Sequence, residues 1–347
     1  MSSIMLDSGA YSAYTKGKII DIDQYVLFLL QHQNLFDYCI NLDVIMNAKA
    51  SYTNWQYLRS FGLNVLPVYH IGTDEIWLKK YLKQTDYIAL GAVANLSSTQ
   101  RMQSLTRIWN SYLTNSEGFP IVNVHGLGVT AVSLMLRYPW FSVDSITPII
   151  AAAYGRIFLP RYTRKNNQDT FSYFNGFFCS VSDQSKQKVG TMTSFLGLPK
   201  LIQEKYMDYI EKKGYVLGNL YHQKKRATKQ DKRENRKEHA SLFSLDQSVK
   251  TDAPDTLANS WNQRLLFNVY VWNQLILRMP EYPRKHDSII PAEIPNHDNK
   301  IHIYYGVSTN THIESIKWVI PQPDILISYA YMTDKLLNTI ESYKKIK

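Results

Sequence analysis

The sequence predicts an α/β protein, a (β/α)8 barrel of TIM type with a basic, partly helical C-terminal insertion. Three observations lead to this prediction. Strand-like and helix-like segments alternate over residues 1–160, polar residues follow the predicted strands, and positive charge is concentrated after residue 160. Such alternation is typical of parallel strands joined by crossover helices. The 347 residues are 45% hydrophobic, which is enough for a large core.

The predicted strands of the first part are short apolar segments rich in β-branched or aromatic residues, and segments of helical period separate them. The strands are predicted at residues 4–6, 38–42, 65–69, 87–90, 121–124, 141–143 and 156–159. The helices are predicted at residues 23–33, 52–61, 74–82, 99–113, 130–137 and 148–154. Seven strands in succession favour a closed barrel, and an open doubly wound sheet is the alternative.

The regular alternation weakens after Pro160. The later elements are predicted as helices at 200–213, 257–278 and 311–318, a proline-rich linker at 280–295, and strands at 300–305 and 325–329. One of the two late strands is expected to close the barrel as its eighth strand. We therefore expect the main part of the barrel in residues 1–160, a basic helical insertion in residues 161–299, and closing elements in residues 300–347.

Positive charge is unevenly distributed along the chain. Residues 1–160 carry 11 Lys and Arg against 10 Asp and Glu, whereas the remaining residues carry 28 against 19. Residues 222–239 alone hold 8 basic and 3 acidic residues. This run predicts a nucleic-acid partner, and a solvated charged helix or loop is the alternative. The residues expected to contact nucleic acid are Lys224, Lys225, Arg226, Lys229, Lys232, Arg233, Arg236 and Lys237.

Cysteine content and hydropathy argue against two classes of protein. Only Cys39 and Cys179 are present, so the chain can build neither a disulfide framework nor a four-cysteine zinc site, and we expect both to pack in the core. No apolar run approaches the roughly 18 to 20 residues that cross a bilayer. Asp7 also lies where a secretory signal would carry its apolar stretch. We expect a cytoplasmic protein without membrane contact.

Polar residues lie where the predicted strands end, which is where barrel enzymes place their functional groups. They are Asp7, Asp43, His70, Gly91, His125 and Asp144. For any single Asp, an N-cap of the next helix is the alternative. Carboxylates that share one barrel mouth repel each other, so one is expected to have a raised pKa while another stays ionised. One can then act as acid and base, and another as nucleophile or charge stabiliser.

Glycines and histidines accompany these carboxylates. The glycines either let backbone amides approach a flat ligand or simply allow tight turns, and they are Gly9, Gly72, Gly91, Gly126 and Gly128. His70 and His125 can serve as general bases, metal ligands or donors to a substrate. No His/Glu pair at helical spacing supports a metal site, so none is predicted.

Five motifs together resemble a known family. DSGAYS, NLDVI, ALGAVAN, HGLGVT and SVDS are similar in order and spacing to motifs of the tRNA-guanine transglycosylases, and more closely to those of phage and bacterial relatives that place 7-deazaguanines in DNA. The resemblance covers about residues 1–160. It implies a pentosyltransferase that exchanges guanine for a 7-deazaguanine base such as preQ0, without a cofactor, in the host cytoplasm if the gene belongs to a phage.

The resemblance also implies roles for single residues. Asp7 would be the general acid and base beside the bound base, and Asp144 the nucleophile on the sugar C1′. Asp43 would accept hydrogen bonds from the Watson–Crick edge of guanine, and Gly91 and Ala92 would supply backbone contacts to the heterocycle. A carboxylate nucleophile can hold the nucleic acid covalently while the bases exchange.

The remaining candidates are aromatic and imidazole side chains. His70 and His125 are expected to contact the substrate. Tyr11, Tyr14 and Tyr69 either support a guanine that has left its stack or pack against neighbouring side chains.

Two departures from the family pattern concern the polymer. The chain has DSGA where the tRNA enzymes usually have DSGG, and it lacks their Cys-x-Cys-x2-Cys plus His zinc site. DNA is therefore the expected substrate, with the basic region after residue 161 in place of the zinc subdomain, and tRNA is the alternative. A non-catalytic nucleic-acid-binding subunit of the family and an unrelated barrel hydrolase acting on sugars or nucleosides are further alternatives.

Overall fold

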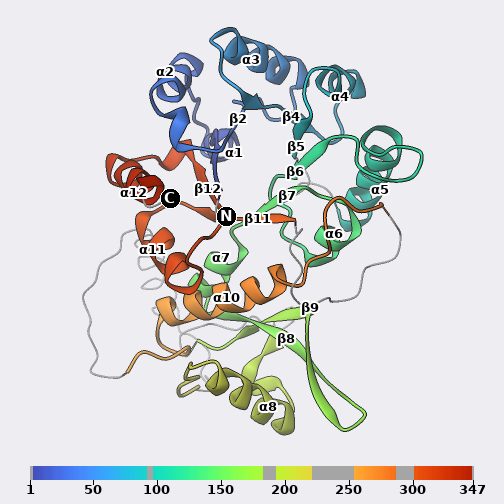
Figure 1. The fold of residues 1–347 in the computed structure, drawn as a ribbon. Helices are drawn as coiled ribbons and strands as arrows, with labels where there is room; N and C mark the ends of the chain where they lie inside the picture. Colours follow the sequence, from blue (N-terminus) through green and yellow to red (C-terminus); the bar gives the residue numbers. More distant parts are fainter. Residues whose placement is uncertain (1–2, 92–96, 183–192, 221–253, 287–300, 346–347) are drawn as a thin grey trace, which may run out of the picture.

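Nine parallel strands form the central sheet of the computed structural model, which describes residues 3–91, 97–182, 193–220, 254–286 and 301–345 (Figure 1). Their order across the sheet is β3-β2-β1-β12-β11-β7-β6-β5-β4. The strands are β1 (Ile4–Asp7), β2 (Tyr38–Ile40), β3 (Val65–Leu66), β4 (Val68–His70), β5 (Tyr87–Gly91), β6 (Asn123–Gly126), β7 (Ser142–Ser145), β11 (His302–Val307) and β12 (Ile325–Ser328).

The two ends of this strand order lie next to each other in the chain. β3 and β4 stand at opposite ends of the order, yet only Pro67 separates them. Asn41 N–H, just after β2, donates to Leu66 O (2.9 Å), while Ala89 N–H of β5 donates to Pro67 O (2.8 Å). The backbone of Leu66 and Pro67 thus bonds to the β2 segment on one side and to β5 on the other. The fold is α/β, and the sheet is nearly closed and barrel-like.

Side chains of the sheet alternate between two separate cores, because successive strand residues point to opposite faces. One cluster lies on the inner face and contains Met5, Ile40, Leu66, Val68, Tyr87, Ala89, Tyr304 and Leu326. The larger cluster lies between the sheet and the helices, and its strand residues include Ile4, Leu6, Ile88, Leu90, Val143, Ile303, Ile325 and Ile327. Figure 1 shows the helices outside the ring of strands.

Helices follow the strands in the positions that the sequence predicts, with ends shifted by a few residues. They are α1 (Ala10–Thr15), α2 (Ile22–His32), α3 (Ala48–Ser60), α4 (Glu75–Leu82), α5 (Ser98–Ile108), α6 (Val132–Arg137), α7 (Thr147–Ala153), α10 (Trp261–Ile276), α11 (Asn310–Val319) and α12 (Asp334–Lys345). A capping box of Ser97 and Gln100 begins α5, where each side chain bonds to backbone N–H groups that the helix leaves open. Helices α1 and α12 had no counterpart among the predicted elements.

The strand predicted at residues 156–159 is present, but it lies outside the central sheet, so its expected place in the barrel was wrong. These residues begin β8 (Arg156–Lys165), which pairs antiparallel with β9 (Gln168–Ser180) in a second sheet completed by β10 (Thr193–Ser194). β11 occupies the place beside β7 instead, and β12 lies between β11 and β1. Both late strands are therefore needed in the central sheet, where only one was expected.

Helix α10 ties the second sheet to the central one. In Figure 1 it crosses between the strand ring and the β8–β9 sheet, with α8 (Lys200–Lys212) on the far side. Asn268 of α10 is fully buried, and its Oδ1 accepts the N–H of Phe158 (2.8 Å). Its Nδ2 donates to the carbonyls of Pro148 and Arg156 (3.1 Å each). One side chain thus joins α7, β8 and α10.

Two predicted features lie outside the described residues. The basic run at 222–239, with all eight of its candidate nucleic-acid contacts, belongs to the segment 221–253, and Ala92 belongs to 92–96. The predicted linker at 280–295 is described only as far as residue 286. Among the helices of the described ranges, none combines the length and the apolar character that a bilayer crossing requires.

Candidate active site

The strand-end residues singled out in the sequence gather at one edge of the central sheet. Asp7 and His70 are the last residues of β1 and β4, and Asp144 lies on β7. Asp43 follows β2 by three residues, and His125 lies on β6. All strands are parallel, so their carboxyl ends meet at the same edge and their side chains face a common centre.

Asp7 has the most perturbed carboxyl group of this cluster. Burial and, to a smaller extent, the negative charges of Asp43 and Asp144 together raise its pKa from the ordinary 3.8 to about 7. The N–H of Gly9, 3.2 Å from Oδ2, and the hydroxyl of Ser328 act in the opposite sense. The mutual repulsion shows that the structure brings the three predicted carboxylates together. A pKa near neutrality suits a group that both gives and takes protons.

Gly9 allows the chain to turn immediately after Asp7. Its φ of 78° is in the left-handed region, and a Cβ there would lie 2.5 Å from the Cβ of Ala330. Asp7 and Ser328 are partners in the register of β1 and β12, so Gly9 lies against the turn that follows β12. The glycine is needed for this close approach of two strand ends.

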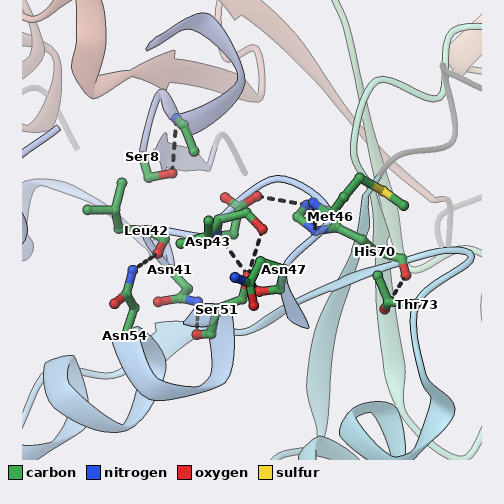
Figure 2. Close-up of polar contacts among 12 residues, drawn as sticks. Ser8, Asn41, Leu42, Asp43, Met46, Asn47, Ser51, Asn54, His70 and Thr73 are labelled. Atoms are coloured by element: carbon green, nitrogen blue, oxygen red, sulfur yellow. Dashed lines mark hydrogen bonds and ion pairs between the residues drawn. The ribbon is translucent and has the colours of Figure 1, made fainter. Parts of the chain in front are cut away.

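Asp43 is held by His70 (Figure 2). His70 Nε2 lies 2.8 Å from Asp43 Oδ2, and both side chains are buried. The N–H of Met46 donates to His70 Nδ1 (3.2 Å), so Nδ1 carries no proton and Nε2 is the nitrogen that donates to the carboxylate. Met46 has a φ of 61°, which is unusual for a residue with a side chain. His70 therefore holds one oxygen of a carboxylate in the candidate site.

Gly91 makes room for this imidazole. A Cβ at Gly91 would lie 2.7 Å from His70 Cδ2 and 3.2 Å from Nε2. The glycine was expected to expose its backbone to a heterocycle. The structure gives it a steric role beside His70, which the sequence did not indicate.

The loop that carries Asp43 is bonded to α3, as Figure 2 shows. Asn41 Nδ2 donates to Ser51 O (2.9 Å), and Asn54 Nδ2 donates to Leu42 O (2.8 Å). Ser51 Oγ accepts the N–H of Val44 (2.9 Å). Sequence reasoning missed these residues, although Ser51 and Asn54 lie three positions apart on one face of the helix. They bond the Asp43 loop to α3 at three points.

Asp144 receives its hydrogen bond from the loop after β6. The N–H of Gly128 donates to Asp144 Oδ1 at 2.7 Å, and His125 Nε2 lies 3.4 Å from the same oxygen. Gly128 has a φ of 64°, a conformation that glycine adopts without strain. The backbone amide reaches the carboxylate because the loop turns here.

His125 is connected to two residues that the sequence analysis did not select. Its Nδ1 lies 2.6 Å from Ser142 Oγ, and Ser142 Oγ lies 2.6 Å from Tyr87 OH. Ser142 precedes Asp144 by two residues, and Tyr87 precedes Gly91 by four. The period of two in β5 and β7 places all four on the inner face and was a signal that could have identified them.

The three carboxylates do not cap helices, so the N-cap alternative is wrong for them. The residue that caps α1 is Gly9, that of α3 is Asn47 and that of α7 is Ile146. Asp21 and Asp74 perform the capping role instead, at α2 and α4.

The candidate tyrosines divide into two groups. Tyr11 and Tyr14 of α1 are exposed. Tyr69 is buried in the core between the sheet and the helices, where its hydroxyl donates to Thr73 O (2.8 Å), so it packs and cannot support a base. Cys39 and Cys179 are buried free thiols, which confirms their predicted packing role.

Within the described residues, no group of three His, Cys, Asp or Glu side chains is arranged to hold a metal ion. Comparisons of the chain with family models, with curated proteins and with solved structures found no match.

Proposed function

We propose that the chain is a guanine transglycosylase that exchanges guanine for a 7-deazaguanine base in DNA through a covalent aspartyl-sugar intermediate. We further propose that its central sheet is a (β/α)8 barrel of TIM type in which β3 and β4 count as one strand interrupted by Pro67. The observation that carries the proposal is the convergence of Asp7, Asp43 and Asp144 at the carboxyl edge of the sheet, with the pKa of Asp7 raised to about 7.

The proposed reaction assigns different tasks to Asp144 and Asp7. An oxygen of Asp144 bonds to C1′ as the bond from C1′ to guanine breaks, and Asp7 gives its proton to the departing base. The incoming 7-deazaguanine then returns a proton to Asp7, and its nitrogen displaces Asp144 from C1′. Carboxylates act as acid and nucleophile in the same way at other glycosidic bonds. The raised pKa of Asp7 supports the acid role, because Asp7 still holds its proton near neutral pH.

Asp43 is proposed to read the base. His70 Nε2 occupies its Oδ2, which leaves Oδ1 as an acceptor for N–H groups of guanine. Two hydrogen bonds hold His70 itself: the N–H of Met46 donates to Nδ1, and Nε2 donates to Asp43 Oδ2. In this proposal His70 acts through Asp43, where the sequence suggested direct contact with the substrate.

DNA is proposed as the polymer because the basic residues after residue 160 supply positive charge and the zinc-site cysteines of the tRNA enzymes are absent. tRNA is the alternative substrate. A non-catalytic binding subunit is less well supported, since binding alone requires neither clustered carboxylates nor an acid of raised pKa.

The test measures base exchange directly. Duplex DNA and tRNA are incubated separately with the protein and a labelled 7-deazaguanine, and the nucleosides are then analysed by mass spectrometry. We expect label in DNA with the wild type and none with Asp144→Asn, while Asp208→Asn on the exposed face of α8 retains activity. Label in tRNA alone would support the alternative, and label in neither polymer would refute the proposal.

The pH dependence of the same assay tests the acid. Loss of guanine requires the proton of Asp7, so we expect the exchange rate to fall as the pH rises through about 7. A rate that stays constant from pH 6 to pH 9 would contradict this role for Asp7.

A further inference from the structure

We propose that Tyr87, Ser142 and His125 form a hydrogen-bonded chain that fixes the orientation of Asp144, so that Oδ1 is held and Oδ2 is the reacting oxygen. The inference rests on the proposed function in so far as it names Asp144 as the nucleophile. The three residues act through Asp144, so they are positioning residues.

The chain of contacts is continuous and enclosed. Tyr87 OH, Ser142 Oγ and His125 Nδ1 follow each other at 2.6 Å per step. His125 Nε2 then faces Asp144 Oδ1 at 3.4 Å and makes no hydrogen bond within the described residues. Ser142 and His125 are fully buried, and Tyr87 is nearly so. The ring of Tyr304 packs against His125 at 75°, with 5.9 Å between the centroids. His125 is therefore confined to one orientation.

The direction of the hydrogen bonds follows from the two ends of the chain. At one end, burial raises the pKa of Tyr87, so its phenol keeps its proton and can donate to Ser142 Oγ. Ser142 then donates to His125 Nδ1, which leaves the proton of the neutral ring on Nε2. At the other end this Nε2–H points toward the carboxylate of Asp144.

The opposite direction is unfavourable. If His125 donated from Nδ1 to Ser142, its bare Nε2 would present a lone pair to Asp144 Oδ1 at 3.4 Å. Two acceptors would then face each other at a buried position, with no donor between them. The carboxylate thus selects the tautomer in which Nε2 carries the proton.

This arrangement distinguishes the two oxygens of Asp144. Oδ1 receives the N–H of Gly128 at 2.7 Å and faces His125 Nε2. Within the part of the chain that the structure describes, no hydrogen bond reaches Oδ2. A nucleophile needs one oxygen held and one oxygen available to carbon. The hydrogen bond from Gly128 to Oδ1, with the imidazole of His125 beside it, provides that condition.

The tautomer can be tested without any substrate. Nitrogen-15 NMR of protein labelled at histidine distinguishes a protonated ring nitrogen from a bare one, and the His125→Gln variant identifies the His125 signals by their loss. We expect the proton of His125 on Nε2 in the wild type, and a mixture of tautomers in Ser142→Ala, because the donor to Nδ1 is gone. A wild-type proton on Nδ1 would overturn the inference, whatever reaction the protein catalyses.

The positioning role is tested by Tyr87→Phe, which removes only the far end of the chain. In steady-state base exchange we expect kcat to fall by about 2- to 10-fold, the effect of one hydrogen bond, with KM unchanged. Tyr38→Phe is the matched control, since the ring of Tyr38 packs against that of Tyr87 at 5.2 Å but lies outside the chain of hydrogen bonds. Equal kcat values for Tyr87→Phe and wild type, or a change in KM alone, would refute the positioning role.

The two tests separate the inference from the function on which it rests. If no base exchange occurs with any polymer, the proposed function fails while the NMR result still decides the tautomer. If base exchange occurs but His125 carries its proton on Nδ1, or Tyr87→Phe leaves kcat unchanged, only the positioning role is refuted.

Discussion

Replacing Asp7 with Asn is expected to stabilise the fold at alkaline pH, although it removes the proposed acid. In the folded protein the pKa of Asp7 is raised to about 7, chiefly by burial, whereas the ordinary value is 3.8. The folded state therefore favours the protonated form more than the unfolded state does. The contribution of this group to stability is greatest below pH 3.8 and is lost as the pH rises through about 7. The amide of Asn carries no charge and avoids this loss.

The size of the effect follows from the difference between the two pKa values. A rise from 3.8 to about 7 means that ionised Asp7 lowers the unfolding free energy of the wild type by roughly 4 kcal/mol at pH 8. At pH 5 most folded molecules hold the proton on Asp7, and this loss of unfolding free energy falls to about 2 kcal/mol. For a chain of this length we expect Asp7→Asn to raise the Tm by about 5 °C at pH 8 and by about 2 °C at pH 5.

Differential scanning calorimetry of wild type and Asp7→Asn at both pH values measures this change. Asp208→Asn is the control, because Asp208 lies on the exposed face of α8, where it pairs with Lys212 at 2.7 Å. Its Tm is expected to match the wild type within about 1 °C. A variant no more stable than wild type at pH 8, or a gain equal at both pH values, would show that burial does not raise the pKa of Asp7.

Two further substitutions test contacts outside the carboxylates. Asn268→Ala removes three hydrogen bonds, two of them fully buried, between α10 and the backbone of α7 and β8. We expect urea unfolding to show a loss of about 2 to 4 kcal/mol. Asn273→Ala on the same helix is expected to change stability by less than about 0.5 kcal/mol, and equal losses would contradict the anchoring role. Gly91→Ala places a Cβ 2.7 Å from His70, and the overpacking is expected to reduce stability by about 1 to 3 kcal/mol. Gly197→Ala is the control, since its Cβ would meet Ser194 at an ordinary contact distance of 3.7 Å; an equally tolerated Gly91→Ala would disprove the steric role.

The residues of the candidate site could be predicted from the sequence because the ends of the strands could be predicted. Asp7, Asp43, His70, His125 and Asp144 follow apolar segments, and parallel strands bring such positions to one edge. The residues that form hydrogen bonds with these side chains were harder to predict. Contact between Ser142 and Tyr87 joins strands 55 residues apart in sequence, and that pairing depends on the order of the strands in the sheet.

The hydrophobic period alone determined where most strands and helices of residues 1–154 would form, because alternation and helical spacing are local properties of the chain. It did not determine strand partners. Residues 156–159 have the same apolar character as a barrel strand, yet they pair with β9, and β11 takes the place beside β7 from more than 150 residues further along the chain. Only the tertiary structure decides between such partners, since the choice depends on hydrogen bonds and packing between segments that are distant in sequence. The same long-range packing raises the pKa of Asp7, for which a position in the sequence gives only the carboxyl group.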